Sequence, residues 1–296
     1  MAREEGTEVS NAEEEPEEVS VSTKPYIQKL ETEHKLIIQK VLGSGSYSRV
    51  ARATWGDKKM EVAAKIINIT PTKEKDDYIK KFLPREKEIV RMLKHDNICR
   101  LYDMITFPDH IVFVTEFCAG GDLLKKMKDV KVMAEDDARF IFRQFIASLR
   151  VLNPGDKSST FCGSRAYVAP EILRGREYST NAVDVWSTGI ILYIMLTGSM
   201  PFDDRHPTKM IERQLAHKIK FPRSCTSSTS SKTLILEILQ PHAPNRPTYK
   251  AICESEWLKN QAYYMKPDAP PATAAAAAAN AASPAKKRPP SSRARG

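Results

Sequence analysis

Hydrophobic and polar residues alternate over much of the first third of the chain, as expected of strands that bury one face. Three such runs, rich in Val, Ile and Ala, come in succession. Two more follow, joined by Pro108-Asp109-His110, a short turn typical of a hairpin. The pattern predicts a small antiparallel sheet with one helix that Pro84 interrupts: strands 35–42, 47–54, 60–69, 101–107 and 111–117, and helix 75–93.

After residue 121 the spacing becomes helical, with apolar residues recurring every three or four positions. A long, mostly apolar run over 183–196 is typical of a buried helix. Serines at 227–231 offer N-caps for the last of two further helices. The second part of the chain is therefore predicted to be helical, with an apolar stripe at Ala138, Ile141, Phe142, Phe145 and Leu149 and helices over 183–196, 210–219 and 232–239.

Both ends of the chain depart from this pattern. The first twenty residues hold eight Glu and one Arg and no aromatic residue, a composition that predicts disorder and excludes a secretory signal. The last part is rich in Ala and Pro and carries a basic cluster beginning at Lys286. We expect an acidic disordered tail over 1–32 and a basic disordered tail over 259–296.

The net charge is +9, and the part between the two tails is basic. A basic body suits nucleic acid, phosphate groups, acidic partners or simple solubility. Aromatic and basic residues do not interleave, which disfavours nucleic acid as a partner. No apolar run reaches the roughly 18 residues that a membrane-spanning helix needs, so no membrane association is expected.

Cysteine usage excludes two further classes. The five cysteines are odd in number and widely spaced, with no C-x-x-C pair, which disfavours a zinc cluster or a disulfide framework. We expect reduced, mostly structural thiols and a cytoplasmic setting. The cysteines are Cys99, Cys118, Cys162, Cys225 and Cys253.

Two features point to phosphate chemistry. Gly43 and Gly45 lie in a turn between two predicted strands, where backbone N–H groups can approach a phosphate closely. Lys65 lies within an apolar strand, where its ammonium needs a partner, and Glu86 on the following helix is the natural one. Taken alone, each feature has an ordinary alternative interpretation. For the glycines it is a common Gly-Ser hairpin turn, and for Lys65 it is an edge-strand lysine that reaches solvent.

Together these residues resemble the small lobe of a eukaryotic protein kinase, and further motifs match in order along the chain. A threonine lies at the gatekeeper position before a hinge, a G-G-D-L turn follows, and an A-P-E motif and a D-V-W-S-T-G segment come later. An arginine lies where the family pairs one with the glutamate of A-P-E. These positions are Thr115, Glu116–Cys118, Gly120–Leu123, Ala169–Glu171, Asp184–Gly189 and Arg246.

Within that family the chain is most similar to testis-specific serine/threonine kinases of the calmodulin-dependent-kinase-like group. The segments 81–86, 159–164 and 201–204 carry this finer resemblance. It implies an α+β, two-lobed protein-kinase-like fold, with an antiparallel-sheet small lobe over 33–118 and a helical large lobe over 119–258, truncated by an internal deletion. It also implies ATP-dependent phosphoryl transfer to Ser or Thr of protein substrates, or binding to a partner kinase.

The resemblance also assigns roles to single residues. Thr160 lies at the activating phosphothreonine, Ser164 in the substrate-docking loop, and Glu171 pairs with Arg246. Asp184 anchors the catalytic loop in the family, and Asp122 lies near the ribose. The implied ATP-binding residues are Leu42, Gly43, Ser44, Gly45, Ser46, Val50, Ala63, Lys65, Glu86, Thr115, Glu116, Cys118 and Asp122.

The two motifs that carry the chemistry of this family are absent from the sequence. An H-R-D aspartate orients the substrate hydroxyl, and the D-F-G aspartate with a nearby asparagine holds magnesium. The chain contains neither motif, and Asp156 is the only aspartate between Asp137 and Asp184. No catalytic residue and no metal ligand can be assigned. The family uses ATP and Mg²⁺, but Mg²⁺ binding by this chain is in doubt.

Resemblance is strong up to Leu149 and again from Val151, which favours one excised block over gradual decay. The chain is therefore predicted to be inactive or nearly so. Three readings stay open: a weak kinase with a substituted metal ligand, a non-catalytic pseudokinase-like interaction protein, and an unstable product of a skipped coding segment or faulty gene model. The basic cluster in the C-terminal tail is also typical of a nuclear-targeting signal, so the nucleus is an alternative location to the cytoplasm.

Overall fold

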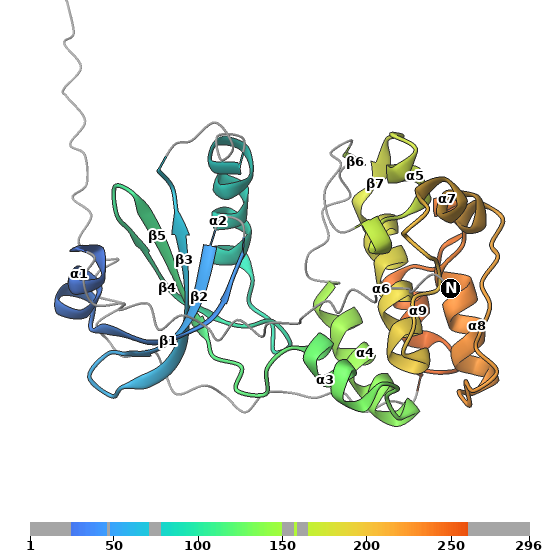
Figure 1. Ribbon diagram of the computed structural model, residues 1–296, viewed down its shortest axis with the longest axis horizontal. Coiled ribbons are helices and arrows are strands. Elements are labelled where there is room, and N and C mark those ends of the chain that lie inside the picture. Colours follow the sequence, from blue (N-terminus) through green and yellow to red (C-terminus); the bar gives the residue numbers. More distant parts are fainter. Residues whose placement is uncertain (1–24, 46–47, 71–77, 150–156, 159–164, 260–296) are drawn as a thin grey trace, which may run out of the picture.

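The computed structural model describes residues 25–45, 48–70, 78–149, 157–158 and 165–259. Figure 1 shows two lobes, one built on a sheet and the other helical. The basic cluster at Lys286, on which the nuclear expectation depends, lies outside the described residues. Across the described ranges, no helix is both long and apolar enough to cross a bilayer.

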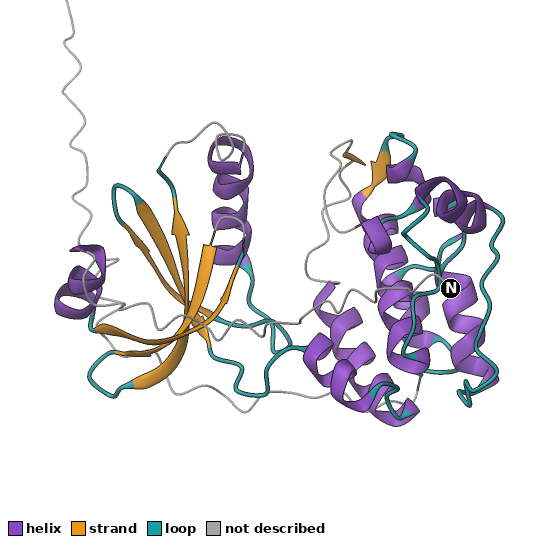
Figure 2. Cartoon of the chain, viewed as in Figure 1, coloured by secondary structure: helices purple, strands orange, loops and turns teal. Residues whose placement is uncertain are grey.

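The small lobe is a five-stranded antiparallel sheet in the order β1-β2-β3-β5-β4 (Figure 2). The strands predicted from alternation are confirmed, with ends shifted by a few residues at most. The hairpin at Pro108-Asp109-His110 joins the last two of them, and the Phe107 amide donates to the His110 carbonyl. The strands are β1 (Leu36–Ser44), β2 (Ser48–Trp55), β3 (Met60–Asn68), β4 (Leu101–Thr106) and β5 (His110–Glu116).

One helix packs on each face of the sheet. Helix α2 (Leu83–Met92) buries Leu83 against the same face as Phe113, and a π-helical turn (Tyr78–Phe82) precedes it. Pro84 lies in the first turn of α2, where its missing N–H leaves no intrahelical bond unmade. Pro84 therefore begins a helix that the sequence analysis expected it to interrupt.

Helix α1 (Pro25–His34) corrects the predicted boundary of the acidic tail at residue 32. It packs on the opposite face of the sheet, where Ile27 and Leu30 are buried with Val62 and Val114. The acidic composition that predicts disorder ends near residue 18, and the apolar positions of α1 come after it. The predicted tail over 1–32 is too long because it includes most of α1 as well as the acidic segment.

The large lobe is a helical body around α6, which is buried along most of its length. The close approach of α6 to α8 requires Gly189, because a Cβ there would lie 2.5 Å from Cγ2 of Ile238. The helices predicted over 210–219 and 232–239 begin about three residues earlier, at Pro207 and after the cap Ser228. The helices are α3 (Leu123–Val130), α4 (Glu135–Leu149), α5 (Pro170–Leu173), α6 (Thr180–Thr197), α7 (Pro207–Leu215), α8 (Thr229–Ile238) and α9 (Tyr249–Glu254).

Four short elements complete the described part of the large lobe. Strands β6 (Lys157–Ser158) and β7 (Tyr178–Ser179) form a two-stranded antiparallel pair. Two 3₁₀ turns lie over Arg165–Tyr167 and Ala243–Asn245. These pieces are too short for periodicity to indicate them from sequence.

Glu135, in the first turn of α4, joins three segments of the large lobe. Its carboxylate accepts hydrogen bonds from the Ser228 amide at 2.7 Å, the Ser228 hydroxyl at 2.5 Å and Trp257 Nε1 at 2.6 Å. Arg139 Nη2 lies 3.2 Å away. Partial burial alone raises the pKa of Glu135, but these hydrogen bonds and the Arg139 charge outweigh it and hold the pKa below its ordinary value.

Replacing Glu135 with Gln is expected to lower the free energy of unfolding by about 2 kcal/mol at pH 7, since bonds to a charged acceptor are lost. A carboxyl with a lowered pKa in the fold stabilises fully above its unfolded pKa, near 4.5, and this stabilisation is lost as the pH falls further. The difference between the two proteins should therefore shrink below about pH 4.5. Urea denaturation at several pH values measures it. Exposed Glu256, changed to Gln, is the control, and an equal loss in both variants would contradict the role of Glu135.

Candidate functional site

Four of the predicted nucleotide-binding residues share the inner face of the small-lobe sheet, the face on which α2 packs. Val50 on β2 pairs in register with Lys65 on β3, and Ala63, two residues before Lys65, pairs with Thr115 on β5. Because side chains alternate along a strand and partners share a face, these four project to one side of the sheet. Gly43 pairs with Val50 on the other side of β2 and extends the row.

Lys65 and Glu86 form the ion pair that the sequence predicts. Lys65 Nζ lies 2.6 Å from Glu86 Oε1, in a partly buried position. The hydroxyl of Tyr78 donates to Glu86 Oε2 at 2.9 Å, and Lys65 Nζ lies 5.8 Å from the centre of the Phe113 ring. Helix α2 thus holds a carboxylate over the sheet, and the lysine ammonium is fixed at the edge of the site.

The glycine-rich turn leaves room beside the sheet. Apart from Gly43 itself and its two chain neighbours, no atom of the described residues lies within 4 Å of the position that a Gly43 Cβ would take. The Gly45 amide donates to the Ser48 carbonyl at 2.7 Å, which closes the turn. Leu42, Gly43, Ser44 and Gly45 are all exposed, and Ser46 lies outside the described residues. The open space and the nearby ammonium of Lys65 suit a ligand that carries phosphate groups.

The predicted hinge, Glu116–Cys118, begins at the last residue of β5, and the hydroxyl of the preceding Thr115 donates to the Ala63 carbonyl at 3.4 Å. Glu116 is held on the backbone of Arg100: its amide donates to the Arg100 carbonyl at 2.9 Å, and its carboxylate accepts from the Arg100 amide at 3.2 Å. The hinge is therefore clamped to the segment that precedes β4. Cys118, which follows, is exposed.

Asp122 has a structural role that the sequence analysis did not assign. It is the N-cap of α3, and its side chain accepts from the Lys125 amide at 2.7 Å. A turn closed by the Gly121 amide and the Cys118 carbonyl, at 3.2 Å, brings Asp122 to the end of the hinge. Nothing in these contacts tests the predicted position near a ribose.

In the large lobe, Glu171 and Arg246 form the predicted buried pair. Nη1 of Arg246 donates to Oε1 of Glu171 at 2.6 Å and Nη2 donates to Oε2 at 2.8 Å. The same guanidinium donates to the carbonyls of Ala182 and Gln240 and lies 4.9 Å from the Trp186 ring. The pair fastens the A-P-E segment to α6 and to the connection before α9.

Asp184, the predicted anchor of the catalytic loop, makes no hydrogen bond or ion pair with any residue that the structure describes. Solvent reaches a substantial part of its side chain, yet the protein around it displaces enough water to raise the pKa of the carboxyl. Its charge also contributes, after burial, to the raised pKa of Tyr249. An anchor carboxylate without a charged or hydrogen-bonding partner is the expected result if the segment that it normally holds is missing.

The expectation that this chain lacks metal ligands stays a prediction. In the described ranges no three His, Cys, Asp or Glu side chains come together in a way that could hold a metal. Asp156, Thr160 and Ser164 lie outside the described residues, so their predicted roles stay predictions. Among the described residues, the site offers the Lys65 ammonium for phosphate oxygens.

Two contributors were missed by sequence reasoning. Tyr78 lies eight residues before Glu86, two helical turns away on the same face, and this spacing is the signal that could have indicated its contact. Asn97 Nδ2 donates to Gln144 Oε1 at 3.1 Å and connects the small lobe to α4. No local pattern indicates that second contact, because it joins residues 47 positions apart.

Comparison with known proteins agrees with this arrangement. The protein kinase domain family matches residues 36–154 and 148–258, two segments that meet where α4 ends. Testis-specific serine/threonine-protein kinase 1 of Mus musculus is 35% identical over 261 aligned positions, covering 75% of this chain and 71% of the relative. Testis-specific serine/threonine-protein kinase 3 of Mus musculus is 32% identical over 255 positions, covering 74% of this chain and 94% of the relative.

The number of aligned positions is larger than the number of residues that this chain contributes to the alignment. For the first relative, 75% of 296 residues is about 222, so about 39 of the 261 aligned positions are filled by the relative alone. A more distant match, the carbon catabolite-derepressing protein kinase of Candida tropicalis, is 33% identical and covers 78% of this chain and 42% of that protein. With the two-lobed fold, the buried Glu171–Arg246 pair and the Lys65–Glu86 pair in place, these matches show that the chain belongs to the serine/threonine protein kinase family.

Proposed function

We propose that this chain binds ATP through its small lobe and transfers the phosphoryl group to protein at a negligible rate. The observation that carries the proposal is an intact Lys65–Glu86 pair, at 2.6 Å, in a chain that contains neither H-R-D nor D-F-G. Phosphate recognition and phosphoryl transfer are thus separated: residues for the first are present and residues for the second are absent.

Nucleotide binding is supported by the inner face of the sheet. Val50, Ala63 and Thr115 share that face with Lys65, as the walls of an adenine site would. Lys65 supplies a fixed positive charge for phosphate oxygens, and a charge-assisted hydrogen bond is about twice as strong as a neutral one. The open backbone at Gly43 leaves the phosphates room to approach.

The transfer deficit is supported by the junction between α4 and the A-P-E segment. Helix α4 ends at Leu149, and Asp156 is the only aspartate between that end and Asp184. One carboxylate cannot both orient the substrate hydroxyl and hold the principal metal ion. The family match in two parts, 36–154 and 148–258, supports one missing block at this junction.

A chain that binds nucleotide without transferring phosphate acts through its contacts with other proteins. We propose that it engages the protein substrates of active family members, or such a kinase itself, and that ATP stabilises the form that binds. Phosphorylation at Thr160 would have no switch effect, because the arginine of H-R-D, which normally pairs with that phosphate, is not in the sequence. Weak kinase activity is the competing function.

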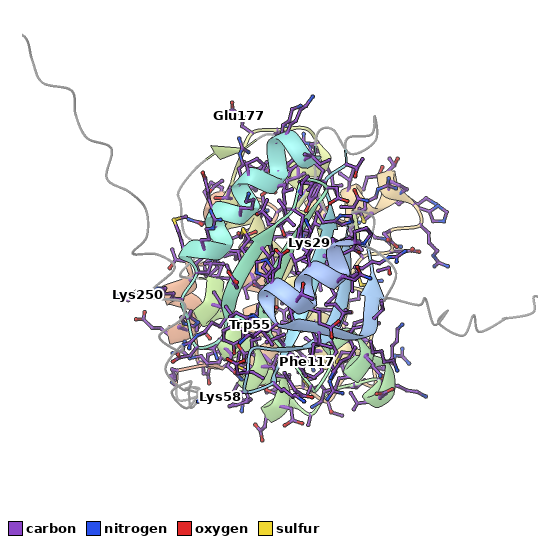
Figure 3. The ribbon with its side chains drawn as sticks, turned by 90° about the vertical axis from the view of Figure 1, so that its left-hand side faces the viewer. Lys29, Trp55, Lys58, Phe117, Glu177 and Lys250 are labelled. Atoms are coloured by element: carbon purple, nitrogen blue, oxygen red, sulfur yellow. The ribbon has the colours of Figure 1, made fainter. Side chains whose placement is uncertain are left out.

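The change Lys65→Ala is expected to weaken ATP binding about tenfold or more, since a charge-assisted bond to phosphate contributes about 1.5–3 kcal/mol. Calorimetric titration of the full chain with ATP, in magnesium and again in excess EDTA, measures this loss. Lys58→Ala is the matched control, because Lys58 lies at the lower edge of the small lobe in Figure 3, at the tip of the β2–β3 turn.

Three outcomes bear on the proposal. ATP binding by the wild-type chain that falls in Lys65→Ala and persists in Lys58→Ala supports the nucleotide site. Equal binding by all three proteins would contradict it. A cooperative thermal transition of the wild-type chain that rises with ATP argues against the reading of an unstable, unfolded product, and its absence would support that reading.

A further inference from the structure

Two exposed cysteines lie in contact beside the hinge. Sγ of Cys99 and Sγ of Cys118 are 3.3 Å apart, and both residues are present as thiols. Cys225 is half-buried and Cys253 is buried. Of the cysteines in the part of the chain that the structure describes, only Cys99 and Cys118 thus combine exposure with a neighbouring sulfur.

The backbone around the pair keeps the two sulfur atoms together. Cys99 precedes Arg100, and Cys118 follows Glu116 by two residues. Arg100 and Glu116 are joined by a backbone hydrogen bond of 2.9 Å, and Glu116 Oε2 accepts from the Arg100 amide at 3.2 Å. One step further into the sheet, Leu101 pairs with Thr115 in register. The cysteines therefore flank an ordered strand pair, and their proximity is a property of the fold.

We propose that Cys99 and Cys118 form a reversible intrachain disulfide when the protein meets hydrogen peroxide. A disulfide needs a sulfur–sulfur distance of about 2.05 Å, so the two atoms have about 1.3 Å to close, a movement that exposed side chains can make. This modification site is inferred without use of the proposed ATP binding or the state of the catalytic motifs, although Cys118 is also one of the implied ATP-binding residues.

The chemistry balances with peroxide as the oxidant. One cysteine, as thiolate, attacks a peroxide oxygen, the O–O bond breaks, and a sulfenic acid and water are produced. The sulfur of the second cysteine attacks the sulfenic sulfur, the S–O bond breaks, and a second water leaves with the proton of that thiol. Two thiols and one hydrogen peroxide thus give one disulfide and two waters, and a dithiol reductant reverses the reaction.

The disulfide would fix the hinge turn to the segment before β4. The Cys118 carbonyl accepts from the Gly121 amide at 3.2 Å, and this turn leads to the N-cap of α3. A covalent link at Cys118 would restrain the connection through which the two lobes are joined in the sequence. Oxidation would thereby act on the hinge itself, and its product can be detected without any activity assay.

The test is peptide mapping of the full chain after brief peroxide treatment and alkylation of the remaining thiols. Trypsin cleaves after Arg100, so Cys99 falls in peptide 95–100 and Cys118 in peptide 101–125, and each other cysteine also has its own peptide. We expect 95–100 and 101–125 to be recovered as one linked species, lighter than their sum by two hydrogen atoms. Dithiothreitol added before alkylation should restore the separate peptides.

The experiment is run in a Cys162→Ser background, which removes the cysteine outside the described residues, and at several protein concentrations. Cys99→Ser and Cys118→Ser should each abolish the linked species, and Cys225→Ser should leave it unchanged. A yield that is independent of protein concentration supports an intrachain bond. The proposal is overturned if Cys99 and Cys118 are recovered oxidised in separate peptides, or if links to Cys225 form equally fast.

Discussion

Inserting a catalytic-loop to D-F-G segment between Arg150 and Val151 is expected to raise phosphoryl transfer about a thousandfold or more. The segment would carry the H-R-D and D-F-G motifs that active members of the family use. It would supply the carboxylates that orient the acceptor hydroxyl and hold magnesium, and electrostatic stabilisation of this kind is the largest single contribution to such reactions. It would also give Asp184 the loop that it anchors in the family.

Transfer of radiolabelled phosphate to a generic protein substrate measures the gain. The control carries the same insert with the aspartates of H-R-D and D-F-G changed to asparagine. It should fold like the active insert and remain as slow as the original chain. If the original chain and the restored chain turn over equally, the proposed separation of binding from transfer is wrong.

The strands of the small lobe could be predicted because each buries one face, so alternation in the sequence reports their position directly. Helix α1 could not be predicted in this way. Its two buried residues, Ile27 and Leu30, are recognised as core residues only when the sheet face on which they pack is known. The starts of α7 and α8 have local signals, Pro207 in the first turn and the N-cap Ser228, and these indicate the helix ends better than apolar spacing does.

The two charged pairs could be predicted for different reasons. Lys65 lies within an apolar strand and needs a partner, and Glu86 on the following helix is the natural one. The pairing of Glu171 with Arg246 is implied by the resemblance to the kinase family. The Cys99–Cys118 contact could not be predicted in the same way, because an exposed thiol does not need a partner. Only the strand register, which places Cys99 beside the hinge, indicates this contact, and register is a property of the folded sheet.

Replacing Arg246 with Ala is expected to lower the free energy of unfolding by about 3–5 kcal/mol, the loss typical of a buried pair deprived of one partner. The Arg246 side chain is only 1% exposed and that of Glu171 13%, so the remaining carboxylate would stay largely buried without its counter-charge. The carbonyls of Ala182 and Gln240 would lose their donor at the same time. Urea denaturation followed by tryptophan fluorescence measures the loss.

The pair Arg205–Asp203 provides the matched control. It also joins a guanidinium to a carboxylate, at 2.8 Å, but the Arg205 side chain is 82% exposed, so water replaces the lost partner and Arg205→Ala should change stability little. Arg246→Lys should lie between the two variants, because an ammonium keeps the charge but cannot donate two parallel bonds to Glu171. If Arg246→Ala unfolds at the same urea concentration as Arg205→Ala, Arg246 does not fasten the A-P-E segment. A large loss would show that this half of the large lobe keeps the packing of an active kinase although the catalytic motifs are absent.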